Sequence, residues 1–149
     1  MKRRVTVELA TVTSRDISQM PKKFPSVRVL VVDDEPLMRW SVAETLADCG
    51  YEVEETGDGR GARDAVGGAG GEFDVILLDF RLPDSEDLSL LRTLRTLAPG
   101  TQVIMMTAFG TPEVIRGALE LGAYRVISKP FEMDLVAEVV AQAHAARMH

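Results

Sequence analysis

Five polar residues stand at the ends of apolar runs in this chain, and their types could together support chemistry on a phosphoryl group. Asp33 and Asp34 end "VRVLVVDD", Asp79 ends "DVILLD", Thr107 ends "QVIMMT", and Lys129 follows "YRVIS". Unbroken apolar runs are typical of strands in parallel sheets that helices cover on both faces, and ligands bind outside the carboxyl ends of such strands. We therefore expect these side chains to meet at one edge of a sheet.

Three carboxylates in one place repel one another and raise one another's pKa unless a cation offsets their charge. Mg²⁺ fits this set best, because it prefers hard oxygen ligands and retains part of its water shell. An ionised carboxylate could then attack a phosphoryl group, with the metal and the lysine neutralising its oxygens and the threonine donating a hydrogen bond. Asp33, Asp34 or Glu35 could instead cap a helix that starts at Pro36. Asp79 has no helix start close behind it.

These residues must be positioned by a chain that repeats one unit, an extended apolar run followed by a helical pattern. The runs cover residues 27–33, 51–56, 74–79, 102–107 and 124–128. The helices between these runs have recognisable ends. Pro36 and Gly50 bound the first helix, the second is short and ends in the loop "GGAGG", and the third covers residues 86–97 before Pro99. The fourth starts at Thr111 and Pro112 and ends at Gly122, and the last starts near Phe131. Five strands alternating with five helices predict an α/β fold, a doubly wound parallel sheet flanked by helices.

Composition indicates one compact domain. The 149 residues are 46% hydrophobic and 27% charged, which suffices for one core and is short for two. The single cysteine, Cys49, cannot form an internal disulfide, and no run approaches the roughly 18 apolar residues of a membrane span. The basic start "MKRR" is not followed by the apolar core of a signal peptide. We expect a cytoplasmic protein without a membrane segment.

Charge divides the chain into two parts. Residues 1–26 hold six basic and two acidic residues, whereas the remainder holds 11 basic and 21 acidic residues. An acidic body argues against direct nucleic-acid binding by the globular part, because phosphate contacts require clustered lysine and arginine. We expect residues 1–26 to form a flexible basic extension, since termini that are not tied to a core are usually poorly ordered.

The motifs around these runs resemble the phosphoacceptor receiver domains of two-component response regulators. The resemblance covers residues 27–147 and rests on "VVDDEP", "DVILLDFRLPD", "MMTAFG" and "GAYRVISKPF", which have the family's order and spacing. "MTAFG" and "KPF" are most similar to receivers that precede ATPase-type transcriptional activators. The resemblance implies a receiver domain over residues 27–149, with a flavodoxin-like sheet of strand order 2-1-3-4-5.

The resemblance also assigns roles to the acidic residues. Asp79 would accept a phosphoryl group from a histidine kinase or phosphotransfer protein. Asp33, Asp34 and Asp79, together with the backbone carbonyl of Arg81, would bind Mg²⁺. A receiver catalyses its own phosphorylation and dephosphorylation but is not a conventional enzyme.

The remaining roles concern switching. Thr107 would be the switch hydroxyl, Lys129 would contact the phosphoryl oxygens, and the peptide bond from Lys129 to Pro130 is expected to be cis. Val126 occupies the switch position where most receivers carry Tyr or Phe, so this chain lacks the usual aromatic side chain there. Asp84 stands where many relatives carry glycine, and we expect its charge near the site to influence which kinase docks.

The implied function is the control of an output domain or partner, in transcription, through a conformational change. The face made by the fourth helix, the fifth strand and the last helix would carry this change and could support a homodimer. The alternative is a phosphorylation-independent interaction module with the same fold. A dinucleotide-binding enzyme is more distant: "GDGRGA" (57–62) matches its glycine pattern, but the preceding strand is too charged. A phosphatase that forms an aspartyl phosphate would need a second acid at position 81, which is arginine.

Overall fold

The computed structural model describes residues 26–68 and 71–147, and these form a single sheet with helices on both faces. The strands are β1 (Arg28–Val32), β2 (Glu52–Thr56), β3 (Val75–Asp79), β4 (Gln102–Thr107) and β5 (Arg125–Ser128). The helices are α3 (Pro36–Asp48), α4 (Gly59–Gly67), α5 (Ser89–Leu97), α6 (Pro112–Glu120) and α7 (Met133–Arg147). The predicted alternation of strand and helix is confirmed. The expected basic extension, residues 1–26, lies almost entirely outside the described residues.

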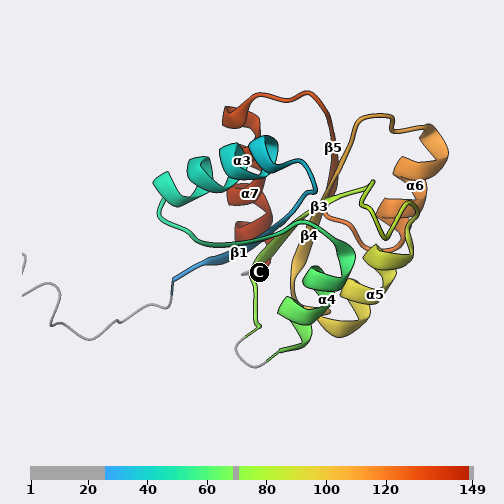
Figure 1. Ribbon diagram of the computed structural model, residues 1–149, viewed down its shortest axis with the longest axis horizontal. Helices are drawn as coiled ribbons and strands as arrows, with labels where there is room; N and C mark the ends of the chain where they lie inside the picture. The colour runs from blue at the N-terminus through green and yellow to red at the C-terminus, as the bar shows by residue number, and fades with distance from the viewer. Residues whose placement is uncertain (1–25, 69–70, 148–149) are drawn as a thin grey trace, which may run out of the picture.

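The sheet is parallel throughout, with the strand order β2-β1-β3-β4-β5. The flavodoxin-like order expected from the family resemblance is therefore confirmed. Figure 1 shows α3 and α7 on one side of the sheet and α4, α5 and α6 on the other. After β2 the chain crosses to the other side of β1 and adds β3, β4 and β5 there. The crevice outside the carboxyl ends of β1 and β3 is the switch point of the sheet, where ligands bind in folds of this kind.

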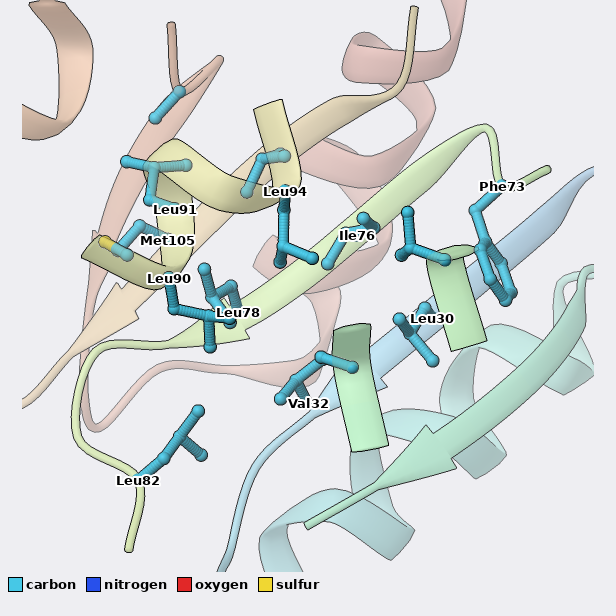
Figure 2. Packing of buried hydrophobic residues seen from close by; sticks show 14 of the residues in the cluster. Leu30, Val32, Phe73, Ile76, Leu78, Leu82, Leu90, Leu91, Leu94 and Met105 are labelled. Atoms are coloured by element: carbon cyan, nitrogen blue, oxygen red, sulfur yellow. The ribbon is translucent and has the colours of Figure 1, made fainter. Parts of the chain in front are cut away.

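Successive side chains of the central strands point to opposite faces and build two cores. Val29 and Val31 of β1 pack with α3 and α7, whereas Leu30 and Val32 pack with α4 and α5. Figure 2 shows the second cluster, in which Ile76 and Leu78 of β3 lie among leucines of α5. All five residues of β3 are buried. This double-sided burial explains why β3 reads as an unbroken apolar run.

Strand β2 differs because it lies at the edge of the sheet. Its sequence, EVEET, keeps Glu52, Glu54 and Glu55 exposed. Glu54 and Glu55 form ion pairs with Arg28 and Arg39. Charged side chains on an edge strand discourage pairing with another chain. The charge that argued against a central strand at this position is thus accommodated at the edge.

The helix ends follow the expected signals, with one shift. Gly50 and Gly122, which follow α3 and α6, have φ angles of 97° and 102°, a conformation that glycine adopts without steric cost. Thr111 caps α6 by accepting a hydrogen bond from the Val114 amide. Helix α5 starts at Ser89 rather than near residue 86, because the Asp87 carboxylate accepts bonds from the amide and hydroxyl of Ser89 and holds the preceding residues in a turn. Within the described residues, no helix combines the length and apolar composition that crossing a bilayer requires.

Candidate functional site

The sheet brings the predicted site residues together at the carboxyl ends of its strands. Asp79 is the last residue of β3 and Thr107 the last residue of β4. Asp33 follows β1, with its amide donating to the carbonyl of Thr56 at 3.1 Å. Lys129 follows β5, with its amide donating to the carbonyl of Thr107 at 2.8 Å. These backbone hydrogen bonds fix the points at which the side chains of Asp33 and Lys129 leave the backbone. The position of the site is therefore a direct consequence of strand register.

The Lys129 ammonium joins two of the carboxylates. Its Nζ donates to Asp33 Oδ2 at 3.0 Å and to Asp79 Oδ2 at 3.2 Å. The Asp33 side chain is fully buried, and the side chains of Asp79 and Lys129 are 8% and 15% exposed. Buried charges are costly unless they are paired and hydrogen-bonded. The shared lysine therefore stabilises a pair of carboxylates that the fold removes from water.

Asp34 completes an acidic triad. Unlike the other two members, its side chain is exposed. One carboxylate oxygen from each of Asp33, Asp34 and Asp79 lies within 4.8 Å of the others. Lys129 carries one positive charge, which does not balance three carboxylates. Hard oxygen donors at this spacing, one of them open to solvent, suit a divalent cation that keeps some of its waters, such as Mg²⁺.

Electrostatics supports the same interpretation. Burial, followed by the nearby charge of Asp33, raises the pKa of Asp79 to about 6, although Lys129 opposes this rise. Burial alone would lower the pKa of Lys129, but its hydrogen bond to Asp33 and the charges of both carboxylates outweigh that effect and raise it. The ammonium therefore stays protonated at neutral pH. Burial is the largest cause of the raised pKa of Asp79 and the charge of Asp33 adds to it, so a further cation beside these carboxylates would favour the ionised form of Asp79.

Arg81 is the second residue of the loop that joins β3 to α5 (residues 80–88). Its amide points back toward the site and donates to Asp79 Oδ1 at 3.4 Å. Its side chain is exposed. The expected role of Arg81 is to bind Mg²⁺ through its backbone carbonyl. Arg81 lies two residues after Asp79, whose carboxylate is another of the expected ligands.

The hydroxyl of Thr107 can donate a hydrogen bond to an acceptor that is added to the site. The residue is 2% exposed, and its Oγ1 accepts a hydrogen bond from the amide of Phe109 at 3.2 Å. Its own hydroxyl proton is therefore available for donation. The Phe109 side chain is 75% exposed. Val126, at the position expected to be aromatic, is partly buried against the cluster around α5, and it pairs with Met105 in the sheet.

Two supporting residues were not identified from the sequence. Arg39, on α3, donates from Nη1 to the carbonyl of Asp33 at 2.8 Å, and its Nε pairs with Glu55 at 3.2 Å. The Glu35 amide donates to Asp33 Oδ1 at 2.9 Å. These contacts hold Asp33 on both its backbone and its side chain. Arg39 belongs to no recognisable sequence motif, so the sequence alone does not indicate that it supports Asp33.

Two further expectations concern Pro130 and Asp84. The peptide bond between Lys129 and Pro130 is cis, as the family resemblance implies. Asp84 is exposed, and its charge is combined with a contact inside the domain. Its carboxylate accepts hydrogen bonds from the amides of Gly59 and Arg60 at the start of α4. These hydrogen bonds lower the pKa of Asp84 and so keep its carboxylate charged, and the expected influence of that charge on kinase docking stays a prediction.

Comparison with known proteins places the chain in a family. Residues 29–141 match the response regulator receiver domain, so the chain belongs to that family. The transcriptional regulatory protein TcrA of Mycobacterium tuberculosis is 38% identical over 112 residues, which cover 75% of this chain and 44% of TcrA. The chain thus spans less than half the length of this relative. Its fold and its acidic triad are those of a receiver.

Solved structures agree with this assignment. A CheY-like receiver domain protein from Methanospirillum hungatei has a TM-score of 0.77 at 29% identity, covering 83% of this chain and 98% of that one. NtrX from Brucella abortus, solved in complex with ATP, has a TM-score of 0.74 at 31% identity, covering 83% of this chain and 28% of NtrX. The similarity to a much longer regulator that binds ATP agrees with the resemblance to receivers of ATPase-type activators. Receivers are phosphoacceptors rather than conventional enzymes, and they partner with histidine kinases.

Proposed function

We propose that this chain accepts a phosphoryl group on Asp79 in the presence of Mg²⁺ and passes the signal on by a conformational change. The observation that carries the proposal is the contact of Lys129 Nζ with both Asp33 and Asp79, at 3.0 and 3.2 Å, beside the third carboxylate of Asp34. A nucleophilic carboxylate, its electrostatic partner and a set of oxygen ligands are thereby collected in one place.

Asp79 is the proposed nucleophile. Its pKa of about 6 leaves the carboxylate mostly ionised at neutral pH, so no general base is needed. One carboxylate oxygen forms a bond to the phosphorus of the donor. The bond between phosphorus and the donor's nitrogen or oxygen breaks, and its electron pair leaves with the donor.

The metal ligands are the side chains of Asp33, Asp34 and Asp79, and the carbonyl of Arg81. A bound Mg²⁺ supplies a positive charge that offsets the carboxylates and the phosphoryl oxygens. Asp33 is held for this task by the Glu35 amide and by Arg39, and the exposed side chain of Asp34 would be accessible to an ion from solvent. The backbone amide of Arg81 donates a hydrogen bond to Asp79 Oδ1.

Lys129 and Thr107 are the proposed sensors of the phosphoryl group. The Lys129 ammonium exchanges part of its contact with Asp79 for a phosphoryl oxygen, and Thr107 donates its hydroxyl proton to another. Movement of the Thr107 hydroxyl changes its bond with the Phe109 amide and so draws in the loop of residues 108–111. This loop leads into α6, and we propose that the face of α6, β5 and α7 changes its two-state equilibrium. Val126 contributes as a packed aliphatic side chain rather than a rotating ring.

The wider setting belongs to the same proposal. A histidine kinase or phosphotransfer protein supplies the phosphoryl group, and the output is a domain or partner in transcriptional regulation, consistent with the regulators that the chain resembles. The receiver covers residues 27–149, residues 1–26 form a basic extension, and the protein acts in the cytoplasm. The face of α6, β5 and α7 is the proposed surface for a homodimer.

Intact-protein mass measures the proposed reaction. The wild type and Asp79→Asn are incubated with acetyl phosphate, with Mg²⁺ or with EDTA. We expect the mass of one phosphoryl group to be gained by the wild type with Mg²⁺ and by neither protein in EDTA, and the substituted protein to gain nothing. A wild type that gains no mass under any condition favours the phosphorylation-independent interaction module.

A further inference from the structure

The loop after the phosphoacceptor is attached to α4 by one carboxylate. Asp84 Oδ1 accepts a hydrogen bond from the Gly59 amide at 2.8 Å, and its Oδ2 accepts one from the Arg60 amide at 3.0 Å. These residues are 25 and 24 positions apart in the chain. The Gly59 bond is the largest of the contacts that lower the pKa of Asp84. Both oxygens of this side chain are therefore engaged by a neighbouring element.

The start of α4 is built to accept this contact. Its first residue is Gly59, where an added Cβ would lie 3.1 Å from Asp84 Oδ1 and 3.1 Å from a methyl group of Leu90. A side chain at this position would therefore crowd the carboxylate. Asp58 separately caps the same helix by accepting a bond from the Gly61 amide at 2.7 Å. Of the first three amides of α4, Asp84 therefore accepts hydrogen bonds from the first two and Asp58 accepts one from the third.

The same loop carries a proposed metal ligand. Leu82 and Ser85 exchange backbone hydrogen bonds of 2.8 and 3.2 Å, which close a tight turn with Asp84 inside it. The Leu82 side chain is 3% exposed, and Figure 2 shows it at the end of the buried cluster nearest this loop. Arg81 directly precedes Leu82. The turn is therefore held by the packing of Leu82 against the core and by the hydrogen bonds between Asp84 and the start of α4. Arg81 lies between this turn and Asp79.

We infer that Asp84 is a positioning residue for the metal site: by tying the loop to the start of α4, its carboxylate holds the Arg81 carbonyl where it can complete the ligand set of Asp33, Asp34 and Asp79. The inference rests on the proposed function, because it assigns a residue that orients one of the proposed ligands. Residues that orient metal ligands without touching the metal commonly change metal affinity by about 10- to 100-fold when they are replaced.

Asp58 offers a matched control. Both Asp58 and Asp84 are carboxylates that accept amide hydrogen bonds from the first residues of α4. Only Asp84 belongs to the loop that contains Arg81. Loss of either carboxylate should weaken the helix start, whereas only loss of Asp84 should release the loop.

The test compares the wild type, Asp84→Ala, Asp84→Asn and Asp58→Ala as full chains. Mg²⁺ affinity is measured by titration calorimetry, and thermal unfolding in EDTA records the stability of each protein. We expect Asp84→Ala to weaken Mg²⁺ binding by roughly 10-fold, as orienting residues do elsewhere. Asp58→Ala should lower the melting temperature but leave Mg²⁺ affinity unchanged. Asp84→Asn, which retains one acceptor oxygen, should fall between the wild type and Asp84→Ala, and it replaces the alanine variant if that variant does not fold.

Two results would overturn the inference. Equal losses of Mg²⁺ affinity in the Asp58 and Asp84 variants would show that both act through the stability of α4. Unchanged affinity in both Asp84 variants would show that this carboxylate only caps the helix. A wild type that binds no Mg²⁺ contradicts the proposed function itself, so the two failures are distinguishable.

Discussion

The Lys129 ammonium lies 3.2 Å from the Asp79 carboxylate, and it reaches across from the end of β5 to the end of β3 to do so. Strand β4 separates these two strands in the sheet. The same ammonium contacts Asp33, which follows β1 on the far side of β3. One side chain thus links the ends of strands across the switch point of the sheet. This contact determines how the site should respond to substitution, pH and Mg²⁺.

Replacing Lys129 with methionine should destabilise the metal-free protein. The change leaves Asp33 and Asp79 buried next to each other without a counter-charge, and removing one partner from a largely buried ion pair costs about 3 kcal/mol. Urea unfolding in EDTA measures this loss. Mg²⁺ should recover part of it, because the ion supplies the missing positive charge. A Lys129→Met protein as stable as the wild type in EDTA would show that the lysine does not offset the carboxylates.

The raised pKa of Asp79 predicts an unusual dependence of stability on pH. In the unfolded chain this carboxyl ionises near the ordinary aspartate pKa of 3.8, whereas in the folded protein it keeps its proton up to about pH 6. Between these values the folded state binds more protons, so the free energy of unfolding falls as the pH rises. The loss is complete slightly above pH 6 and reaches at most about 3 kcal/mol, since one pKa unit corresponds to about 1.4 kcal/mol.

Asp79→Asn provides the comparison for this effect. The asparagine cannot ionise, so in EDTA the difference in unfolding free energy between the variant and the wild type should grow from pH 4 to pH 7 in favour of the variant. Denaturant titrations at several pH values measure it. A constant difference across this range would show that burial and the Asp33 charge do not perturb Asp79.

The fold was predictable because two features of the sequence indicate it. Apolar runs alternate with helical patterns, and polar residues mark the ends of the runs. Apolar runs at 27–33, 74–79 and 102–107 became the three central strands, β1, β3 and β4, and the charged run at 51–56 became the edge strand β2. Parallel register then places the residues that end each run at one edge. The acidic triad and its lysine follow from this rule without knowledge of any distance.

The contacts that cross between elements were not predictable. Asp84 and Gly59 are 25 residues apart, and neither lies in a pattern that indicates the other. The same holds for Arg39 and the Asp33 carbonyl, because a side chain that bonds to backbone leaves no signature of its partner. These contacts depend on how far each helix is displaced along its strand, which pattern alone does not encode.

Thr107→Val should separate phosphorylation from switching. Valine has nearly the shape of threonine but lacks the hydroxyl that we propose to contact the phosphoryl group. We expect the variant still to accept phosphoryl groups, while hydrogen exchange across residues 107–130 no longer changes when it does. Thr107→Ser keeps the hydroxyl and should retain the change. Wild-type protection that stays the same across 107–130 on phosphorylation would contradict the proposed route through the loop and α6.

Arg81 and Phe109 should prolong the phosphorylated state. Both side chains are exposed and lie two residues beyond Asp79 and Thr107, so we expect them to flank the phosphoryl group and hinder attack by water. Trimming both to alanine should shorten the lifetime of the phosphorylated protein, followed by intact mass after the donor is removed. Leu119→Ala, which trims an exposed apolar side chain near the far end of α6, serves as the control. A lifetime equal to that of the wild type in the double variant would remove these side chains from the account.

The most direct test of the central claim is to identify the residue that carries the phosphoryl group. Borohydride reduces an aspartyl phosphate to homoserine, so treating the phosphorylated protein and sequencing its peptides by mass spectrometry marks the acceptor permanently. We predict homoserine at position 79 alone, dependent on Mg²⁺ during phosphorylation. Homoserine at position 33 or 34, or none in a protein that has gained a phosphoryl group, would contradict the assignment of Asp79 as the nucleophile.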